Sequence, residues 1–259
     1  MNTIWALAGV VIKEMYRRKD FYVLFVLTAL ITIAAGMVNF FHDPKIVRYV
    51  KDICMLLIWV SALLIAIVTT ARQIPAERES RTIFPLLAKP VTRWQVILGK
   101  FLGCWLATGM ALVVFYVFFA IITGSREQHW PLLTYLQALW LQWAMIAVVI
   151  ALSLCVSIFS AAPSSTTTIC FIAVAGILLV GGHLNLVALR QSQPLQNIFY
   201  TIYFLIPHLE WFDVRDRVVY DWGLVDWLDC LLATLYAAVY TLLFLLLAWL
   251  GFRRKSLNT

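Results

Sequence analysis

The sequence predicts an all-α polytopic membrane protein, and three observations lead to this fold class. Of 259 residues, 63% are hydrophobic and only 13% are charged, whereas about 25% is usual for a soluble domain. The mean hydropathy is +0.89. Several apolar runs reach the roughly 20 residues that a helix needs to cross a hydrocarbon core of about 30 Å. We therefore expect one helical transmembrane domain over residues 1–259.

Six spanning helices are predicted along the chain. Gly99 and Gly103, at the start of the third, permit close helix packing. Lys100 between them is expected at the membrane interface, with its stem along the apolar surface. The five cysteines lie in or beside these spans without metal-ligand spacing, so they are interpreted as buried free thiols and no metal site is expected. The predicted spans are about 21–41, 53–71, 97–123, 134–159, 168–189 and 230–252.

The placement of lysine and arginine in the predicted loops indicates the orientation. With the N-terminus inside, the inner segments hold most of the 20 basic residues, and the outer ones mostly have acidic neighbours. The formal net charge of +7 is therefore an orientation signal, and no nucleic-acid partner is expected. Both termini are predicted to face the cytoplasm.

Residues 1–20 form a leader in which apolar residues recur at helical spacing and basic residues gather at the end. This pattern is typical of an amphipathic helix in the headgroup plane, with cations facing membrane lipid. The alternative is that the leader extends the first spanning helix into the cytoplasm. The cluster Arg17-Arg18-Lys19-Asp20 favours the interfacial helix because it would mark a bend. The apolar positions are Ile4, Leu7, Ala8, Val11 and Met15.

A densely charged loop at 72–96 separates the second and third predicted spans. Pro75 fits the first turn of a short helix, and Pro85 limits how far that helix continues. Thr92 is expected to cap the third spanning helix. A short helix with charges on one side and apolar side chains on another can dock into a groove on a soluble partner. The alternative is a solvated loop without a partner.

This loop resembles the corresponding segment of ABC-2 type permeases, which reads as acids, an Arg or Gly before Thr, Leu-Leu, Pro, Arg and then Gly-Lys. Residues 12–21 are similar to the family's N-terminal elbow helix, and 206–213 resembles its segment before the last span. The resemblance is closest to the copper-enzyme-maturation (NosY-like) branch. The matching loop residues are Glu77, Glu79, Arg81-Thr82, Leu86-Leu87, Pro90, Arg93 and Gly99-Lys100.

The resemblance implies a non-enzymatic permease subunit of an ABC transporter, by default an exporter, in a bacterial inner membrane. Two copies would pair as a homodimer, and each would dock a separate cytoplasmic ABC ATPase through a coupling helix. ATP and magnesium would bind that ATPase, because this chain lacks a glycine-rich phosphate loop; no cofactor is expected here. The residues expected to contact the ATPase are Glu77, Arg78, Glu79, Arg81, Thr82, Phe84, Leu86, Leu87 and Arg93.

Polar residues inside the predicted spans are candidates for lining a translocation path. An ionisable group there is a functional candidate by default, whereas glutamines more often join helices by hydrogen bonds. His183 lies near the outer end of its span, where contact with headgroups is the simpler interpretation. The candidates are Gln137, Gln142, Ser153, Ser157 and His183.

The predicted extracytoplasmic loop at 190–229 contains apolar residues at helical spacing between Pro194 and Pro207, and tryptophans among charged residues after it. An interfacial or partly re-entrant helix is expected, followed by an aromatic belt. This loop could bind an extracytoplasmic accessory protein or close the outer exit. It could equally rest on the outer leaflet.

Three other functions are weighed. An intramembrane protease needs catalytic or metal-binding residues within spans, but Glu77, Glu79 and Arg81 lie in a loop between prolines. A secondary transporter usually has inverted repeats and buried charges near the midplane, and neither pattern is evident. The remaining alternative is a membrane assembly or mechanotransmission subunit that relays ATPase-driven motion to an extracytoplasmic partner without moving cargo.

Overall fold

The computed structural model describes residues 2–17, 22, 26, 30, 44–80, 91–127, 130–160, 162–189, 193 and 195–254. Within them the regular secondary structure is helical and no strand occurs, as the sequence predicts. The structure describes Tyr22, Val26 and Leu30 of the first predicted span, and the rest of that span lies outside the described residues. Among the described residues, five helical segments are long and apolar enough to cross a membrane: Lys51–Glu79, Arg93–Gly124, Leu132–Phe159, Pro163–Gly181 and Trp227–Arg253.

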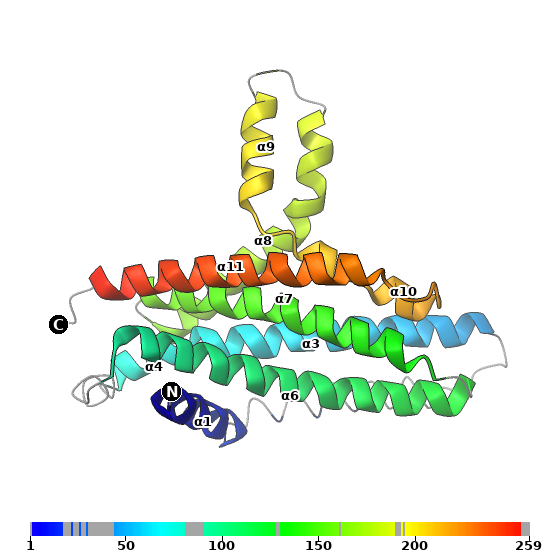
Figure 1. Ribbon diagram of the computed structural model, residues 1–259, viewed down its shortest axis with the longest axis horizontal. Helices are drawn as coiled ribbons and strands as arrows, with labels where there is room; N and C mark the ends of the chain where they lie inside the picture. The colour runs from blue at the N-terminus through cyan, green and yellow to red at the C-terminus, as the bar shows by residue number, and fades with distance from the viewer. Residues whose placement is uncertain are drawn as a thin grey trace.

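Four long helices run side by side along the longest axis of the molecule (Figure 1). The helix α7 lies at the centre and contacts the other three as well as α8 (Pro163–Leu189). Its most apolar window is 78% buried, against 22% for α11, so α7 forms the core and α11 turns a face outward. The four are α3 (Pro44–Ala71), α6 (Arg93–Glu127), α7 (Leu132–Phe159) and α11 (Trp227–Arg254).

The short helix α4 (Gln73–Glu79) follows α3 after one turn residue, Arg72. Pro75 causes this break, because proline has no N–H to donate to the carbonyl of Ala71 and its ring clashes with that carbonyl. Pro75 lies in the first turn of α4, as predicted from the sequence. Figure 1 places α4 and the end of α11 at one end of the bundle and α10 (Arg215–Val219) at the other.

The leader forms α1 (Asn2–Arg17), which crosses beside α6 (Figure 1). A Cβ built on Gly103 would lie 2.7 Å from Val11 Cβ, and one on Gly99 would lie 2.6 Å from Leu7 Cβ. The two glycines therefore allow the close packing that the sequence predicts. The apolar stripe of α1 faces protein, since Ala8 and Val11 are buried. Its placement in the headgroup plane stays a prediction.

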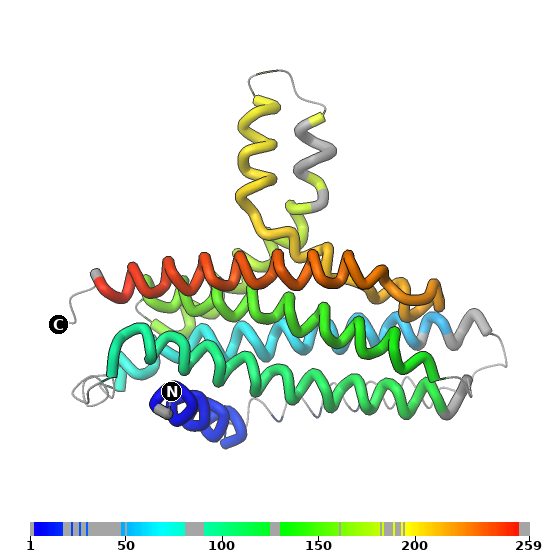
Figure 2. The backbone as a smooth tube through the Cα atoms, viewed as in Figure 1, coloured from blue at the N-terminus to red at the C-terminus, as the bar shows by residue number. Residues whose placement is uncertain are grey.

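The helix α8 (Pro163–Leu189) bends away from the bundle, and its last turns form a hairpin with α9 (Leu195–Leu205). The smooth trace in Figure 2 shows this hairpin leaving the bundle between its two ends. The chain then returns to the bundle through a 3-10 helix, η1 (Leu209–Phe212), and α10. The helix predicted between Pro194 and Pro207 is thus present as α9.

Candidate functional site

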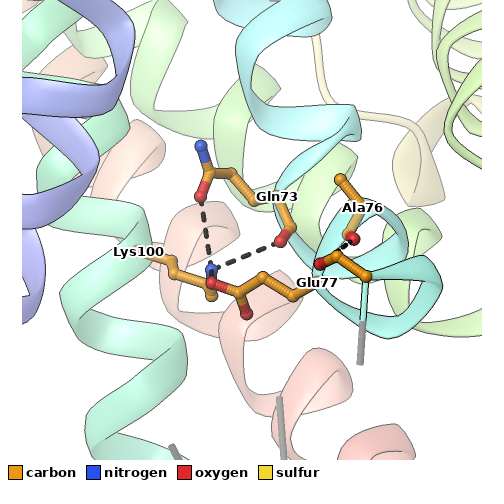
Figure 3. A network of polar contacts seen from close by, with 5 residues as sticks. Gln73, Ala76, Glu77 and Lys100 are labelled. Atoms are coloured by element: carbon orange, nitrogen blue, oxygen red, sulfur yellow. Dashed lines mark hydrogen bonds and ion pairs between the residues drawn. The ribbon is translucent and has the colours of Figure 1, made fainter. Parts of the chain in front are cut away.

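A buried lysine attaches α4 to α6. Lys100 on α6 is 3% exposed, and its ammonium donates to Glu77 Oε1 at 2.7 Å and to Gln73 O and Gln73 Oε1, each at 3.3 Å (Figure 3). The ammonium of Lys100 is thus enclosed by α4, and the predicted level of this residue at the membrane interface stays a prediction. A lysine in this interior position needs a charged partner and further acceptors, and α4 supplies both.

Arg78 attaches the same helix to α7. Its guanidinium donates to Ile158 O at 3.0 Å and to Ser160 O at 3.5 Å. These carbonyls lie at the C-terminal end of α7, where a helix leaves its last acceptors without intrahelical donors and where the helix dipole favours a cation. The helix α4 is therefore held by one side chain from α6 and by one of its own side chains on α7.

The residues of α4 that were predicted to contact the ATPase thus have different surroundings. Glu77 and Arg78 bind the transmembrane bundle, whereas Glu79 and the following Ser80 are exposed. Sequence spacing alone could not separate them, because Lys100 and the end of α7 lie far along the chain. Five other predicted contact residues lie outside the described residues: Arg81, Thr82, Phe84, Leu86 and Leu87.

Arg93 joins the first turn of α6 to the end of α11. It donates to the carbonyl of Phe252 and, at 3.0 Å, to that of Arg253, and its guanidinium lies 5.5 Å from the centroid of the Phe252 ring. Thr92 caps α6, as predicted: Gln95 N donates to Thr92 Oγ1 at 3.3 Å and Thr92 N donates to Gln95 Oε1 at 3.0 Å. This reciprocal pair is a capping box.

Two tryptophans join α6 to α7 by a reciprocal contact that the sequence analysis missed. Trp105 Nε1 donates to Trp143 O at 3.1 Å, and Trp143 Nε1 donates to Trp105 O at 3.2 Å. The rings stack with centroids 4.5 Å apart. A Cβ on Gly109 would lie 2.5 Å from Trp143 Nε1, so this glycine provides the space for the ring.

The predicted path residues on α7 are buried among neighbouring helices. Gln137 makes two hydrogen bonds with the backbone of Val225, donating to its O at 3.1 Å and accepting from its N at 3.0 Å. Gln142 Oε1 accepts from Tyr116 at 2.9 Å. Ser157 donates within its own helix, to Leu154 O at 2.7 Å.

The remaining two candidates differ in exposure. Ser153 is buried, and its carbonyl lies 4.0 Å from the sulfur of Cys170 on α8. His183 is exposed, and its Nδ1 lies 3.1 Å from Leu179 O one turn earlier. The structure therefore does not bring the five candidates together on one surface, and a path lined by them stays a prediction.

The segment between α9 and α11 contains an ion pair that packs on the middle of α3. The Arg215 guanidinium donates two hydrogen bonds to the Asp213 carboxylate, of 2.8 and 2.6 Å, and lies 5.1 Å from the centroid of the Trp59 ring on α3. The Asp213 carboxylate raises the pKa of Arg215. Lys51 on α3 lies 3.6 Å from Asp221. These residues were not among the sequence candidates.

Comparison with known proteins connects this arrangement to a family. A family model described as "ABC-2 family transporter protein" matches residues 5–257, which is nearly the whole chain. No match was found among curated proteins. Within the described part of the chain, no group of three or more His, Cys, Asp or Glu side chains could hold a metal ion. This match over residues 5–257, which includes all the spanning candidates among the described residues, shows that the chain belongs to the ABC-2 family of transporter proteins.

Proposed function

We propose that the chain is the membrane-spanning permease subunit of an ABC exporter that couples to a separate cytoplasmic ATPase through α4. The family match supports a permease that works with an ABC ATPase. The observation that supports α4 as the coupling element is its double attachment, by Glu77 to Lys100 of α6 and by Arg78 to the end of α7. A force applied to α4 would reach two spanning helices at once.

The exposed end of α4 is the proposed contact with the motor. Glu79 and Ser80 are exposed there, and residues 81–90, which follow directly, supply the remaining predicted contacts. In this proposal Glu77 and Arg78 transmit motion and do not bind the ATPase themselves. Arg93 likewise stabilises the junction of α6 and α11 at the same end of the bundle.

The rest of the assembly follows from the same proposal. Two copies would form a homodimer in a bacterial inner membrane, both termini would face the cytoplasm, and ATP and magnesium would bind only to the ATPase. The basic residues Arg93 and Arg253 lie together at the α4 end of the bundle, which supports an inward orientation of that end. The NosY-like branch and an extracytoplasmic accessory protein are part of the proposal.

A second candidate is a mechanotransmission subunit that moves no cargo. It is favoured by the contacts of Gln137, which joins α7 to the loop before α11, so that motion of α7 would reach the opposite end of the bundle. In that case the segment between α9 and α11 would be the working surface.

Co-purification tests the coupling. The tagged protein is purified from its native membrane in mild detergent, and the associated proteins are identified by mass spectrometry. We expect a stoichiometric ATPase, recognised by its own phosphate loop, and its loss in Glu79→Lys. The matched control is Asp216→Lys, an equal charge change at an exposed position on α10. Retention of the ATPase by Glu79→Lys, or recovery of the chain alone from the wild type in several detergents, contradicts the proposal.

A further inference from the structure

The chain from Phe204 to His208 is bonded to the middle of the last spanning helix. Tyr240 donates to Phe204 O at 3.2 Å, and Tyr236 Oη accepts from His208 N at 2.9 Å. The rings of Trp211 and Tyr236 lie 5.1 Å apart. Tyr240 is the central residue of the 27-residue segment Trp227–Arg253. The root of the α8–α9 hairpin is therefore at the level of the centre of this span.

A helix rises about 1.5 Å per residue, so Tyr236 lies about 6 Å from the level of Tyr240. The hydrocarbon core extends about 15 Å on each side of its centre. If the span is centred in the bilayer, His208 and Trp211, which pack on Tyr236, lie at hydrocarbon depth. Glu210 lies between them in the sequence.

Contact with the spanning helix α3 places Asp213 and Arg215 at hydrocarbon depth as well. Arg215 lies over Trp59, which is eight residues along the span that begins at Lys51. Eight residues of helix correspond to about 12 Å. The Asp213–Arg215 pair is therefore also well below the end of the spanning helices.

These charged side chains are partly exposed at this depth. The side chains of Glu210, Asp213 and Arg215 are 35%, 25% and 23% exposed, and Asp216 is also exposed. Charged groups facing lipid cost several kcal/mol, roughly 2.5–3.5 on insertion scales. The backbone here is a short 3-10 helix and a five-residue helix, and irregular backbone at membrane depth is tolerated only inside protein or beside water.

We propose that η1 and α10 line a water-filled vestibule that opens at the end of the bundle opposite α4 and reaches the middle of the membrane. The α8–α9 hairpin projects away from the bundle (Figure 1), and its root, bonded to Tyr236 and Tyr240, marks the inner end of this vestibule. This inference rests on the membrane-spanning role proposed above, and a second copy of the chain would close the far wall. The vestibule admits water and polar solutes from the non-cytoplasmic side.

The outer face of α11 is apolar at the depth where η1 and α10 carry charged residues. Leu235 precedes Tyr236 and is 55% exposed, close to the 53% of Trp211. No charged residue occurs in α11 between Asp229 and Arg253. The face of α11 that carries Leu235 is suited to lipid, whereas η1 and α10 at similar depth carry acids and an arginine. Leu235 and Trp211 are about equally exposed, so their accessibility to a water-soluble reagent can be compared directly.

Thiol accessibility tests the vestibule. Trp211→Cys, Asp216→Cys and Leu235→Cys are made singly and treated, in sealed vesicles or cells, with a charged, membrane-impermeant methanethiosulfonate applied from the non-cytoplasmic side. The wild type, with its five cysteines, supplies the background. Labelling in SDS shows that each new thiol is present. Because the thiolate is the reacting species and forms in water, we expect Trp211→Cys and Asp216→Cys to react at least roughly tenfold faster than Leu235→Cys.

The outcomes separate this inference from the proposed function. Slow labelling of both Trp211→Cys and Asp216→Cys means that lipid or protein covers the segment and overturns the vestibule, even when the ATPase co-purifies. Equal, fast labelling of all three positions means that the Leu235 face of α11 does not face lipid, and this result also overturns the vestibule. Asp216→Cys removes no packed ring, so it keeps the test valid if Trp211→Cys folds poorly.

Discussion

Lys100 Nζ lies 2.7 Å from Glu77 Oε1, and this contact joins a spanning helix to the short helix at the end of the bundle. The lysine side chain is 4% exposed and the glutamate side chain 27% exposed. Gln73 adds two acceptors to the same ammonium. Such a pair contributes little net stability relative to a well-packed apolar pair, but removing one partner leaves a buried charge uncompensated.

We therefore expect Glu77→Gln, which leaves the buried Lys100 ammonium without its carboxylate, to destabilise the protein by about 3–5 kcal/mol. The double variant Lys100→Met with Glu77→Gln should recover part of this loss, because no unpaired charge remains. Unfolding in mixed detergent micelles measures the free energies, and a double-mutant cycle gives the coupling. Effects that simply add would contradict the pairing.

The packing of α1 on α6 depends on Gly103. A Cβ there would lie 2.7 Å from Val11 Cβ and 3.0 Å from Ala8 O, so Gly103→Ala should cost about 1–3 kcal/mol by overpacking. Gly176 on α8 is the matched control, because nothing lies within 4 Å of its Cβ position. Gly176→Ala should be neutral or stabilise by up to about 1 kcal/mol. Equal melting temperatures of the two variants would show that α1 does not pack here.

The reciprocal tryptophan contact makes a separate prediction. Trp143→Phe keeps an aromatic ring against Trp105 but removes the indole N–H that donates to Trp105 O. We expect a loss of about 0.5–1.5 kcal/mol for the hydrogen bond. Trp130→Phe, at an exposed tryptophan near the start of α7, should change little. A Trp143→Phe variant as stable as the wild type would mean that stacking alone joins α6 to α7.

Burial lowers the pKa of His208, while Glu210 nearby opposes this shift. The ring is packed among Tyr203, Trp211 and Tyr236. A histidine whose pKa is lowered in the packed state stabilises that state above its unperturbed pKa of about 6.5 and loses this contribution as the pH falls below it. Acid should therefore weaken the attachment of the hairpin to α11.

Spin-label distances between Ile198 on α9 and Leu247 on α11, both exposed, measure this attachment. We expect the distance distribution to broaden between pH 8 and pH 5 in the otherwise native protein and to stay constant in His208→Gln. Glu210→Gln should enlarge the acid response, because it removes the charge that favours the imidazolium. A response that persists unchanged in His208→Gln would assign it to another group.

Periodicity and composition predicted most of the helices. The apolar runs, the glycine pair at Gly99 and Gly103, the cap at Thr92 and the position of Pro75 are local signals, and the structure agrees with each. The cap and the proline act through backbone groups within a turn, and the small size of the two glycines can be read from the sequence, although the α1 side chains that pack on them lie far along the chain. The amphipathic pattern of the leader predicted α1 but not its partner, because an apolar stripe fits a helix as well as it fits lipid.

The directions of the site residues could not be predicted in the same way. Glu77 and Glu79 are only two residues apart, yet Glu77 binds Lys100 and Glu79 is exposed. The Lys100 partner is 23 residues away and the acceptors of Arg78 are 80 and 82 residues away, so only the tertiary fold brings them together. For the same reason the packing of Arg215 on Trp59, below the end of α3, could not be predicted from local sequence patterns.

The central claim is that the exposed end of α4 contacts the ATPase, and site-specific photocrosslinking tests it most directly. A photoreactive amino acid replaces Glu79, or as a control Trp211, which packs on Tyr236 of α11 away from the α4 end of the bundle, and membranes are irradiated before solubilisation. We predict a covalent product between position 79 and a polypeptide that mass spectrometry identifies as an ABC ATPase, and none from position 211. Crosslinking of the ATPase at 211 and not at 79 would contradict the account, as would a product at 79 that contains only lipid or a second copy of this chain.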